Sequence, residues 1–365
     1  MRVLQVYHHF RPCTGGIERH IEDLCINLIN KGHKSDVVCL DYCHDKKEKL
    51  PHYEEYSNIE INRLPFVDLK IYNIAPGVLK IIKQYDLIHI HGIGFFSDFL
   101  ALTSFIHRIP LILTTHGGIF HTKNHYFLKK IYFNLWCKFI LKRFKRIIAV
   151  SKNDEKLFSK VSSKVTFIPN GIELKDFSNI SKNEEQNSFI FVGRLSKNKR
   201  VDNLIRMIFF LKKKVKNVKL YVIGEDWEET LTYLKKLTED LELKENVIFL
   251  GKVRDRIKLI DYYSRAQFFL SASQYEGFGI TVLEAMASGK IVAVNDISPF
   301  KEFVNNNENG FIVDYSRPKV AANKIFSLLN KDLSNVKKRA SATVEDYSWG
   351  KIIKKIETVY ETGER

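Results

Sequence analysis

Short apolar runs alternate with helical segments along the whole chain, and this alternation limits the possible folds more than any other feature. In the first half, runs such as Val3–Tyr7 and Pro110–Thr115 end in glycine-containing turns. Continuous apolar runs are typical of strands that helices cover on both faces, and therefore of parallel sheets. The alternation restarts at Phe189, after Pro169–Ile172 and a polar run over 178–188 that we interpret as a hinge and linker. The sequence thus predicts an α/β protein with two doubly wound, Rossmann-like domains.

The length of 365 residues agrees with two domains. We expect an N-terminal domain over 1–172 and a C-terminal domain over 173–346. A last helix over 347–365 is expected to pack back on the first domain. Regions 41–57 and 65–74 carry little pattern and are expected to be surface loops.

Composition limits the class of partner without selecting one. The net charge of +16 favours polyanions such as nucleic acid, acidic lipid or phosphorylated ligands. No run of about 20 apolar residues exists, so we expect no transmembrane helix, and the first residues resemble a strand rather than a secretion signal. The five cysteines lack metal-ligand spacing, and we expect buried or free thiols in a reducing, cytosolic compartment.

The segment from Glu276 to Gly289 has the strongest chemical pattern. Its helix is predicted from Ile280 to Ala287, directly after the flexible turn Gly277-Phe278-Gly279. The free N–H groups at a helix N-terminus can bind an anion. Glu276 and Glu284 could hold hydroxyl groups beside that anion, as a nucleotide-sugar requires. The alternative is an ordinary helix with two solvated glutamates.

A second glycine-rich turn follows the first predicted strand. Gly15 and Gly16 precede a helix predicted from Ile17 to Lys31, as in a βαβ phosphate-binding unit. The pattern is not the G-x-G-x-x-G dinucleotide motif. A turn that merely needs positive φ is the alternative.

Taken together, these motifs resemble the retaining nucleotide-sugar glycosyltransferases of family GT4, and the resemblance covers essentially the whole chain. The motifs are Gly15-Gly16, Thr115-His116-Gly117, Ile168-Pro169-Asn170-Gly171-Ile172, Gly193-Arg194-Leu195, Lys199, Phe249-Leu250-Gly251, the Glu276/Glu284 pair and Asn309-Gly310. The resemblance implies the GT-B architecture, in which two Rossmann-like domains face each other across a cleft. This chain differs from the family pattern in one place. Many members have glycine after the lysine, and this chain has Arg200 there.

The resemblance implies a role for each matching residue of the C-terminal half. Arg194 and Lys199 would clamp the donor diphosphate, and Glu284 would accept hydrogen bonds from the ribose. Glu276 would hold hydroxyls of the transferred sugar. The backbone of Phe278, Gly279 and Ile280 would assist it, and Val253 would flank the base.

The N-terminal half would supply fewer contacts. Gly15 and Gly16 would approach the distal phosphate, and His116 would lie near the reacting face of the sugar. A structural histidine is the alternative for His116. The resemblance implies no metal and no cofactor, because protein cations replace the divalent ion.

The implied reaction moves a hexose, with retention, from GDP-mannose or a UDP-hexose to a hydroxyl of a glycan or lipid-linked acceptor. One alternative is a nucleotide-sugar epimerase of the same fold, although its acid–base carboxylates are not evident. The other is a non-enzymatic basic binding protein. The basic residues are spread among helices and no RNA-binding motif occurs, so we expect no nucleic-acid partner.

A basic stretch over 127–146 contains no acidic residue. We predict one apolar helical face, made of Leu128, Ile131, Tyr132, Leu135 and Phe139. Either this face packs into the core and a basic face is solvated, or the helix docks on an anionic membrane. The second interpretation places the protein in the cytoplasm, peripheral on the inner face of the membrane.

Overall fold

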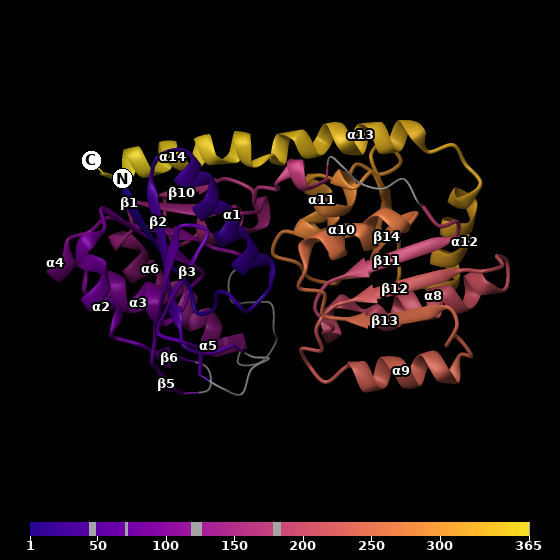
Figure 1. The fold of residues 1–365 in the computed structure, drawn as a ribbon, viewed down its shortest axis with the longest axis horizontal. Coiled ribbons are helices and arrows are strands. Elements are labelled where there is room, and N and C mark those ends of the chain that lie inside the picture. The colour runs from indigo at the N-terminus through magenta and orange to yellow at the C-terminus, as the bar shows by residue number, and fades with distance from the viewer. Residues whose placement is uncertain (44–48, 70–71, 118–125, 178–183, 365) are drawn as a thin grey trace. The chain divides into compact units, whose positions relative to one another are not determined.

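A computed structural model describes residues 1–43, 49–69, 72–117, 126–177 and 184–364. The chain divides into two compact units. The first contains Met1–Gly171 and Trp349–Arg365, and the second contains Ile172–Ser348. Each is an α/β unit built on its own sheet (Figure 1). The interpretation of 178–188 as a linker falls largely on residues outside those described.

The sheet of the first unit has eight strands in the order β10-β9-β8-β7-β1-β2-β4-β3. Their bounds are β1 Arg2–Val6, β2 Lys34–Leu40, β3 Tyr53–Tyr56, β4 Ile59–Leu64, β7 Leu87–His91, β8 Leu111–Thr114, β9 Arg146–Ala149 and β10 Val165–Phe167. All neighbouring strands are parallel except β3 and β4. Every residue of β7 and β8 is buried, which confirms that helices cover both faces at the centre of this sheet.

The helices of this unit follow its strands. They are α1 Gly16–Asn30, α2 Val78–Ile81, η1 Ile82–Gln84, α3 Phe95–Leu102, α4 Ser104–His107, α5 Tyr126–Ile131, the π-helix η2 Tyr132–Cys137, α6 Lys138–Ile140, η3 Leu141–Arg143, α7 Lys152–Phe158 and α14 Trp349–Glu364. The last helix, α14, lies beside α1 (Figure 1). Its buried side chains, among them Trp349, Ile352 and Tyr360, share one core cluster with β1 and β7.

The second unit has a six-stranded parallel sheet in the order β13-β12-β11-β14-β15-β16. The strands are β11 Ser188–Val192, β12 Lys219–Ile223, β13 Val247–Gly251, β14 Phe268–Ser271, β15 Ile291–Val294 and β16 Phe311–Ile312. The helices are η4 Leu174–Phe177, η5 Lys197–Lys199, α8 Val201–Lys212, α9 Leu231–Asp240, α10 Arg256–Arg265, α11 Ile280–Ala287, η6 Phe300–Glu302, α12 Pro318–Leu329, α13 Ser334–Val344 and η7 Glu345–Tyr347.

Two regions expected to be loops contain strands. Within 41–57, β3 pairs antiparallel with β4 at the edge of the sheet. Within 65–74, the two-residue strands β5 Val67–Asp68 and β6 Asn73–Ile74 pair antiparallel. These strands are short and largely solvent-exposed, so their sequences lack the apolar runs that identify the central strands.

The prediction that all cysteines are thiols is wrong for two of them. Cys13 and Cys43 form a disulfide, while Cys25, Cys39 and Cys137 are buried thiols. Cys13 lies in the loop after β1 and Cys43 shortly after β2, and these two strands are parallel neighbours. The pairing follows from this topology, which cysteine spacing alone does not reveal. The cysteine pattern therefore gives no support for a reducing compartment.

For 127–146, the interpretation that the predicted apolar face packs into the core is also wrong. Leu128, Leu135 and Phe139 are 62%, 69% and 52% exposed, whereas Phe133 and Ile140 are buried. The stretch carries two apolar faces at helical spacing, and periodicity does not determine which one meets the core. The sheet and α3 cover the face that contains Phe133, Cys137, Ile140, Leu141 and Phe144.

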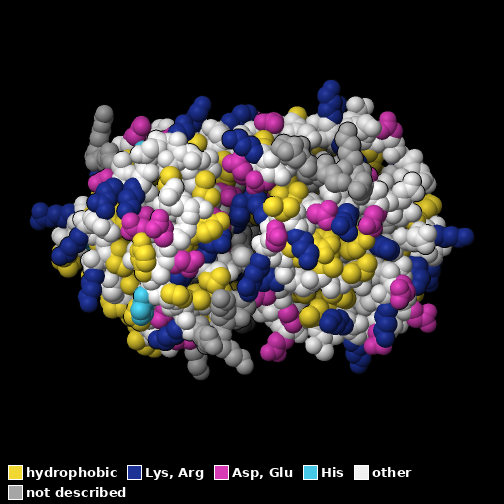
Figure 2. All heavy atoms as spheres, in the orientation of Figure 1, with side chains coloured by type: hydrophobic (Ala, Val, Ile, Leu, Met, Phe, Trp, Pro, Cys, Tyr) yellow, Lys and Arg dark blue, Asp and Glu magenta, His cyan; other side chains and the backbone are white. Residues whose placement is uncertain are grey.

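The surface agrees with the expected spread of positive charge. Lysine and arginine side chains are scattered over the face shown in Figure 2 and do not gather in one stripe. Among the described residues, every helix is too short or too polar to cross a bilayer.

Candidate functional site

The second unit brings two glycine-containing loops together where its strand order reverses. Chain order runs outward from β11 to β12 and β13 on one side, and from β14 to β15 and β16 on the other. In sheets of this kind, ligands bind at the carboxyl ends of the two strands flanking the reversal. The loops that leave those ends contain Gly193–Lys199 and Ser273–Glu276.

The two loops meet through Lys199 and Glu276. The Lys199 Nζ lies 2.5 Å from the Glu276 Oε1, and the Ser273 hydroxyl donates to the same oxygen at 2.8 Å. Both side chains are largely shielded, with 17% and 14% exposure. The backbones are joined as well, because the Gln274 N–H donates to the Asn198 carbonyl at 2.8 Å. The site therefore holds a preformed cation–carboxylate pair.

Arg194 lies in the first of these loops, against an aromatic ring. Its guanidinium carbon is 4.1 Å from the centre of the Trp227 ring, which is a cation–π contact. The loop after β12 that carries Trp227 is held to the backbone of Leu195. The Trp227 N–H donates to the Leu195 carbonyl at 3.2 Å, and the Thr230 hydroxyl donates to the same carbonyl at 2.8 Å.

The predicted anion-binding helix is α11, and Gly279 shapes its beginning. Gly279 has φ of 101°, and a Cβ there would lie 2.6 Å from the Phe300 ring. The ring of Phe278 is buried against Phe303 and Tyr347. The first N–H groups of a helix have no partners within the helix. The backbone of Phe278, Gly279 and Ile280 is thus the part of this turn that can meet a ligand.

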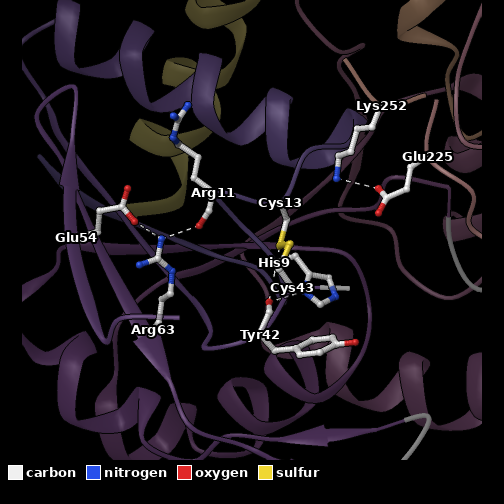
Figure 3. Close-up of a disulfide and its surroundings, with 9 residues drawn as sticks. All are labelled: His9, Arg11, Cys13, Tyr42, Cys43, Glu54, Arg63, Glu225 and Lys252. Atoms are coloured by element: carbon white, nitrogen blue, oxygen red, sulfur yellow. Dashed lines mark hydrogen bonds and ion pairs between the residues drawn. A yellow bond between two sulfur atoms is a disulfide. The ribbon is translucent and has the colours of Figure 1, made fainter. Parts of the chain in front are cut away.

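Glu284 is one turn inside α11 and is oriented by a buried tyrosine. The Tyr263 hydroxyl donates to the Glu284 Oε2 at 3.0 Å. Burial and the nearby Glu284 raise the pKa of Tyr263 well above its usual value, so this hydroxyl keeps its proton. Val253 is half-buried in the loop after β13, next to Lys252, whose Nζ pairs with Glu225 at 2.9 Å (Figure 3).

In the first unit, the loop between β1 and α1 ends at Gly15 and Gly16, and Gly16 begins α1. Several contacts hold this loop in place (Figure 3). The Cys13–Cys43 disulfide joins it to the loop after β2. The buried guanidinium of Arg63 donates to the Arg11 carbonyl at 2.6 Å and to Glu54 at 2.5 Å.

His116 follows β8, with φ of 49°. Its Nε2 lies 3.0 Å from the Nδ1 of His91, at the end of the neighbouring strand β7. The adjacent backbone is held by Asp154, because the Gly117 N–H and the Thr115 hydroxyl donate to its Oδ2 at 2.7 and 2.5 Å. Hydrogen bonds thus hold both the His116 ring and the backbone next to it.

Among the described residues, one cluster has the spacing to hold a metal ion. Ring nitrogens of His20, His91 and His116 all lie within 4.8 Å of one another. Burial is the main cause that lowers the pKa of each ring, that of His20 to about 3 and those of the other two well below 6.5. His91 and His116 already form a hydrogen bond, so their proximity does not require an ion.

The residues predicted from sequence fall into two groups, one in each unit. Lys199 and Glu276 are in direct contact, and they share one strand-end region with Arg194 and α11. Gly15, Gly16 and His116 belong to the first unit. Sequence reasoning missed the supporting residues Trp227, Tyr263, Ser273 and His91. Only Ser273 carried a sequence signal, as the polar residue directly after a predicted strand.

Two Rossmann-like units, with a cation–carboxylate pair and a helix N-terminus at the reversal point of the second sheet, define the GT-B class of glycosyltransferases. Comparisons with known proteins agree. Residues 173–347 match the model for glycosyl transferases group 1, and residues 14–176 match that for Glycosyltransferase Family 4. The sucrose-phosphate synthase of Thermosynechococcus elongatus has the same fold, with a TM-score of 0.82 at 19% identity over 99% of this chain and 98% of that one.

Curated relatives narrow the class further. The GDP-mannose:cellobiosyl-diphosphopolyprenol alpha-mannosyltransferase of Xanthomonas campestris is 30% identical over 360 residues, which cover 97% of this chain and 94% of that protein. The protein of the same name from Komagataeibacter xylinus is 29% identical over 316 residues, covering 86% and 80%. The chain belongs to glycosyltransferase family 4 and is a hexosyltransferase of glycan assembly. The epimerase alternative is not supported.

Proposed function

We propose that this protein transfers mannose from GDP-mannose, with retention of configuration, to a hydroxyl of a polyprenyl-diphosphate-linked oligosaccharide. Two curated relatives, the proteins from Xanthomonas campestris and Komagataeibacter xylinus, carry names that specify this donor and this kind of acceptor. The observation that carries the proposal is the Lys199–Glu276 pair at the reversal point of the second sheet.

On the donor side, Arg194 and Lys199 stabilise the diphosphate as negative charge grows on it. Fixed cations aimed at a developing charge typically lower a barrier by several kcal/mol. The N-terminus of α11 adds partial positive charge from its free N–H groups. Glu276 accepts hydrogen bonds from the hexose, and Glu284 accepts them from the ribose. Because protein cations balance the charge, transfer requires no divalent ion.

The bond between the sugar C1 and the phosphate oxygen breaks, and the acceptor oxygen bonds to C1 on the same face. The proton of the acceptor hydroxyl passes to the leaving phosphate oxygen, so no separate base is consumed. Gly15 and Gly16 allow close approach of the distal phosphate because neither carries a Cβ. His116 lies beside the sugar, and Val253 flanks the base.

The direct test is transfer to a polyprenyl-diphosphate oligosaccharide, assayed with GDP-mannose and with UDP-glucose. We expect an α-linked mannosyl product, identified by its anomeric NMR signals, at a rate that EDTA does not change. GDP should raise the temperature of thermal unfolding more than UDP or ADP does. Rates for Arg194→Ala within threefold of the wild-type rate would refute the phosphate clamp.

We also propose that the exposed face of 127–146 docks on an anionic membrane where the acceptor resides, at its inner face. Large apolar side chains that point to solvent from one short segment are typical of an interaction surface. Phe127 is 73% exposed, and Leu128, Ile131, Leu135, Trp136 and Phe139 are also exposed. Seven basic residues accompany them, and no acidic residue lies between 127 and 146. Apolar side chains that insert into a bilayer, together with basic side chains that attract anionic headgroups, are typical of a surface that binds acidic lipid.

Flotation with vesicles tests this docking. We expect binding to vesicles with anionic lipid, weaker binding to neutral vesicles, and loss of binding in Lys138→Glu/Lys142→Glu. The matched control Lys235→Glu/Lys236→Glu makes the same charge change on exposed residues of α9 and should bind normally. A second pair, Leu135→Ser/Phe139→Ser, tests insertion against the exposed control pair Ile257→Ser/Val320→Ser. Equal binding of test and control pairs would refute the docking.

A further inference from the structure

A row of buried polar side chains leads from the centre of the first unit to His116. In order, they are Cys25, Ser35, Gln5, His91 and His116. The successive distances are 3.3 Å from Ser35 Oγ to Cys25 Sγ, 3.3 Å from Gln5 Nε2 to Ser35 Oγ, 2.9 Å from His91 Nε2 to Gln5 Oε1, and 3.0 Å from His116 Nε2 to His91 Nδ1. The first four are almost fully buried, so no water competes for these bonds.

The orientation of the Gln5 amide determines which atoms donate and which accept in the hydrogen bonds of this row. Its nitrogen donates to the Ser35 hydroxyl, and the Gln5 side chain also acts to lower the pKa of Tyr360 of α14, as a donor near the hydroxyl does. The amide nitrogen therefore faces the two hydroxyl oxygens, while the amide oxygen faces His91. With the amide reversed, one of its protons would be left without a partner in the core, which is unfavourable.

A proton assignment for the histidines follows. The Gln5 Oε1 can only accept, so the Nε2 of His91 must carry the proton. A neutral imidazole carries one proton, which leaves the Nδ1 of His91 as an acceptor. The Nε2 of His116 must then donate to it. Burial lowers the pKa values of His91 and His116, so both rings are neutral near pH 7.

We propose that Gln5 and His91 are positioning residues that hold His116 in its Nε2–H tautomer, so that its Nδ1 accepts a hydrogen bond from a sugar hydroxyl. The tautomer rests on the geometry of the first unit alone. The contact with the sugar rests on the placement of His116 under Proposed function. In this form Nδ1 cannot donate to a phosphate oxygen, so the role of His116 is to orient a hydroxyl.

Two-bond ¹H–¹⁵N correlation spectra of the full chain, labelled with ¹⁵N-histidine, read the tautomer directly. His116 signals are assigned by their loss in His116→Asn. We expect an unprotonated Nδ1 far downfield of a protonated Nε2. An Nδ1–H tautomer, or a rapidly exchanging mixture, overturns the proposal. The wild-type spectrum decides this point even if core variants fail to fold.

Variants at Gln5 connect the tautomer to transfer. Gln5→Leu removes the acceptor of the His91 proton, so we expect mixed tautomers at His116 and kcat lower by about tenfold. Gln5→Glu keeps an accepting oxygen and should restore both the tautomer and the rate. If the Gln5 variants change the transfer rate but not the His116 signals, the link between the tautomer and transfer is wrong. If the tautomer is found but His116→Asn transfers at the wild-type rate, the contact with the sugar is wrong and the tautomer assignment stands.

Discussion

The Nζ of Lys199 lies 2.5 Å from the Oε1 of Glu276, although 77 residues separate them in the chain. The contact forms because β11 and β14 are parallel neighbours, so the loops after them leave the same edge of the sheet. Lys199 thus has a carboxylate partner before any donor binds. Under the proposed function, a donor diphosphate would take Lys199 from Glu276 and release the carboxylate to hold the hexose hydroxyls.

Lys199→Met should lower kcat/KM by at least about 100-fold, since a fixed cation aimed at developing charge supplies about 3 kcal/mol of transition-state stabilisation. Steady-state kinetics with varied donor concentration measure this. The control is Lys197→Met, because Lys197 is exposed and lies two residues earlier in the same turn. A comparable loss in both variants would indicate a general charge effect rather than a site contact.

Trp227→Leu should weaken donor binding by about fivefold, because an indole ring in contact with a guanidinium contributes about 1 kcal/mol. Trp227→Phe keeps an aromatic face and should recover most of the affinity. Thermal-shift titration with GDP gives the dissociation constants. If Leu and Phe behave alike, the ring of Trp227 does not orient Arg194.

The alternation of strands and helices predicted the two α/β units because the central strands are buried on both faces and leave uninterrupted apolar runs. The edge strand β3 has the sequence Tyr-Glu-Glu-Tyr and is half-exposed, so it left no such run. For 127–146, periodicity identified an amphipathic helix but not its buried face, since both apolar faces have helical spacing.

For the candidate site, the sequence likewise predicted individual residues but not the contacts between them. Glu276 could be proposed from the glycine turn and helix that follow it, and Lys199 from the resemblance to family GT4, but their contact depends on strand order, which one sequence does not encode locally. Arg200 adopts φ of 51° and forms a bidentate pair with Asp202. This ion pair, which offsets the strain of a left-handed residue, could not be predicted from the spacing of residues in the sequence.

Tyr263→Phe should weaken nucleotide binding by about fivefold, measured as the dissociation constant for GDP. The variant removes one hydrogen bond, worth about 1 kcal/mol, from the Oε2 of Glu284 and leaves the buried ring in place. Glu284→Gln tests the carboxylate itself and should weaken binding at least as much. Unchanged affinity in Tyr263→Phe would show that α11 orients Glu284 without the hydroxyl.

Gly279→Ala should destabilise the protein and disturb the start of α11. The new Cβ would lie 2.6 Å from the Phe300 ring, at a φ of 101°. Gly289→Ala, at the other end of α11, is the control because its φ of 69° is also positive and no atom lies within 4 Å of the added Cβ. We expect about 1 kcal/mol of destabilisation in the control, from conformation alone, and at least about 1 kcal/mol more in Gly279→Ala. Urea unfolding measures both.

The free energy of unfolding should fall as the pH decreases below 6.5, because buried neutral histidines resist protonation. Burial lowers the pKa values of His20 and His89 to about 3. Between pH 6.5 and 3 the unfolded chain therefore binds more protons than the folded one, and stability rises with pH. Asp98 and Asp154 act in the opposite sense, because burial raises their pKa values above the usual 3.8.

His20→Phe isolates one histidine from this sum. Neither ring nitrogen of His20 has a hydrogen-bond partner, so the substitution removes a titrating group without breaking a bond. Between pH 7.5 and 5.5, we expect the variant to lose about 1.4 kcal/mol less stability than the wild type. Urea unfolding at both values measures the difference, with Trp349 as a fluorescent probe 5.3 Å from the ring of residue 20. Equal losses in the two proteins would mean that His20 is not the group that titrates.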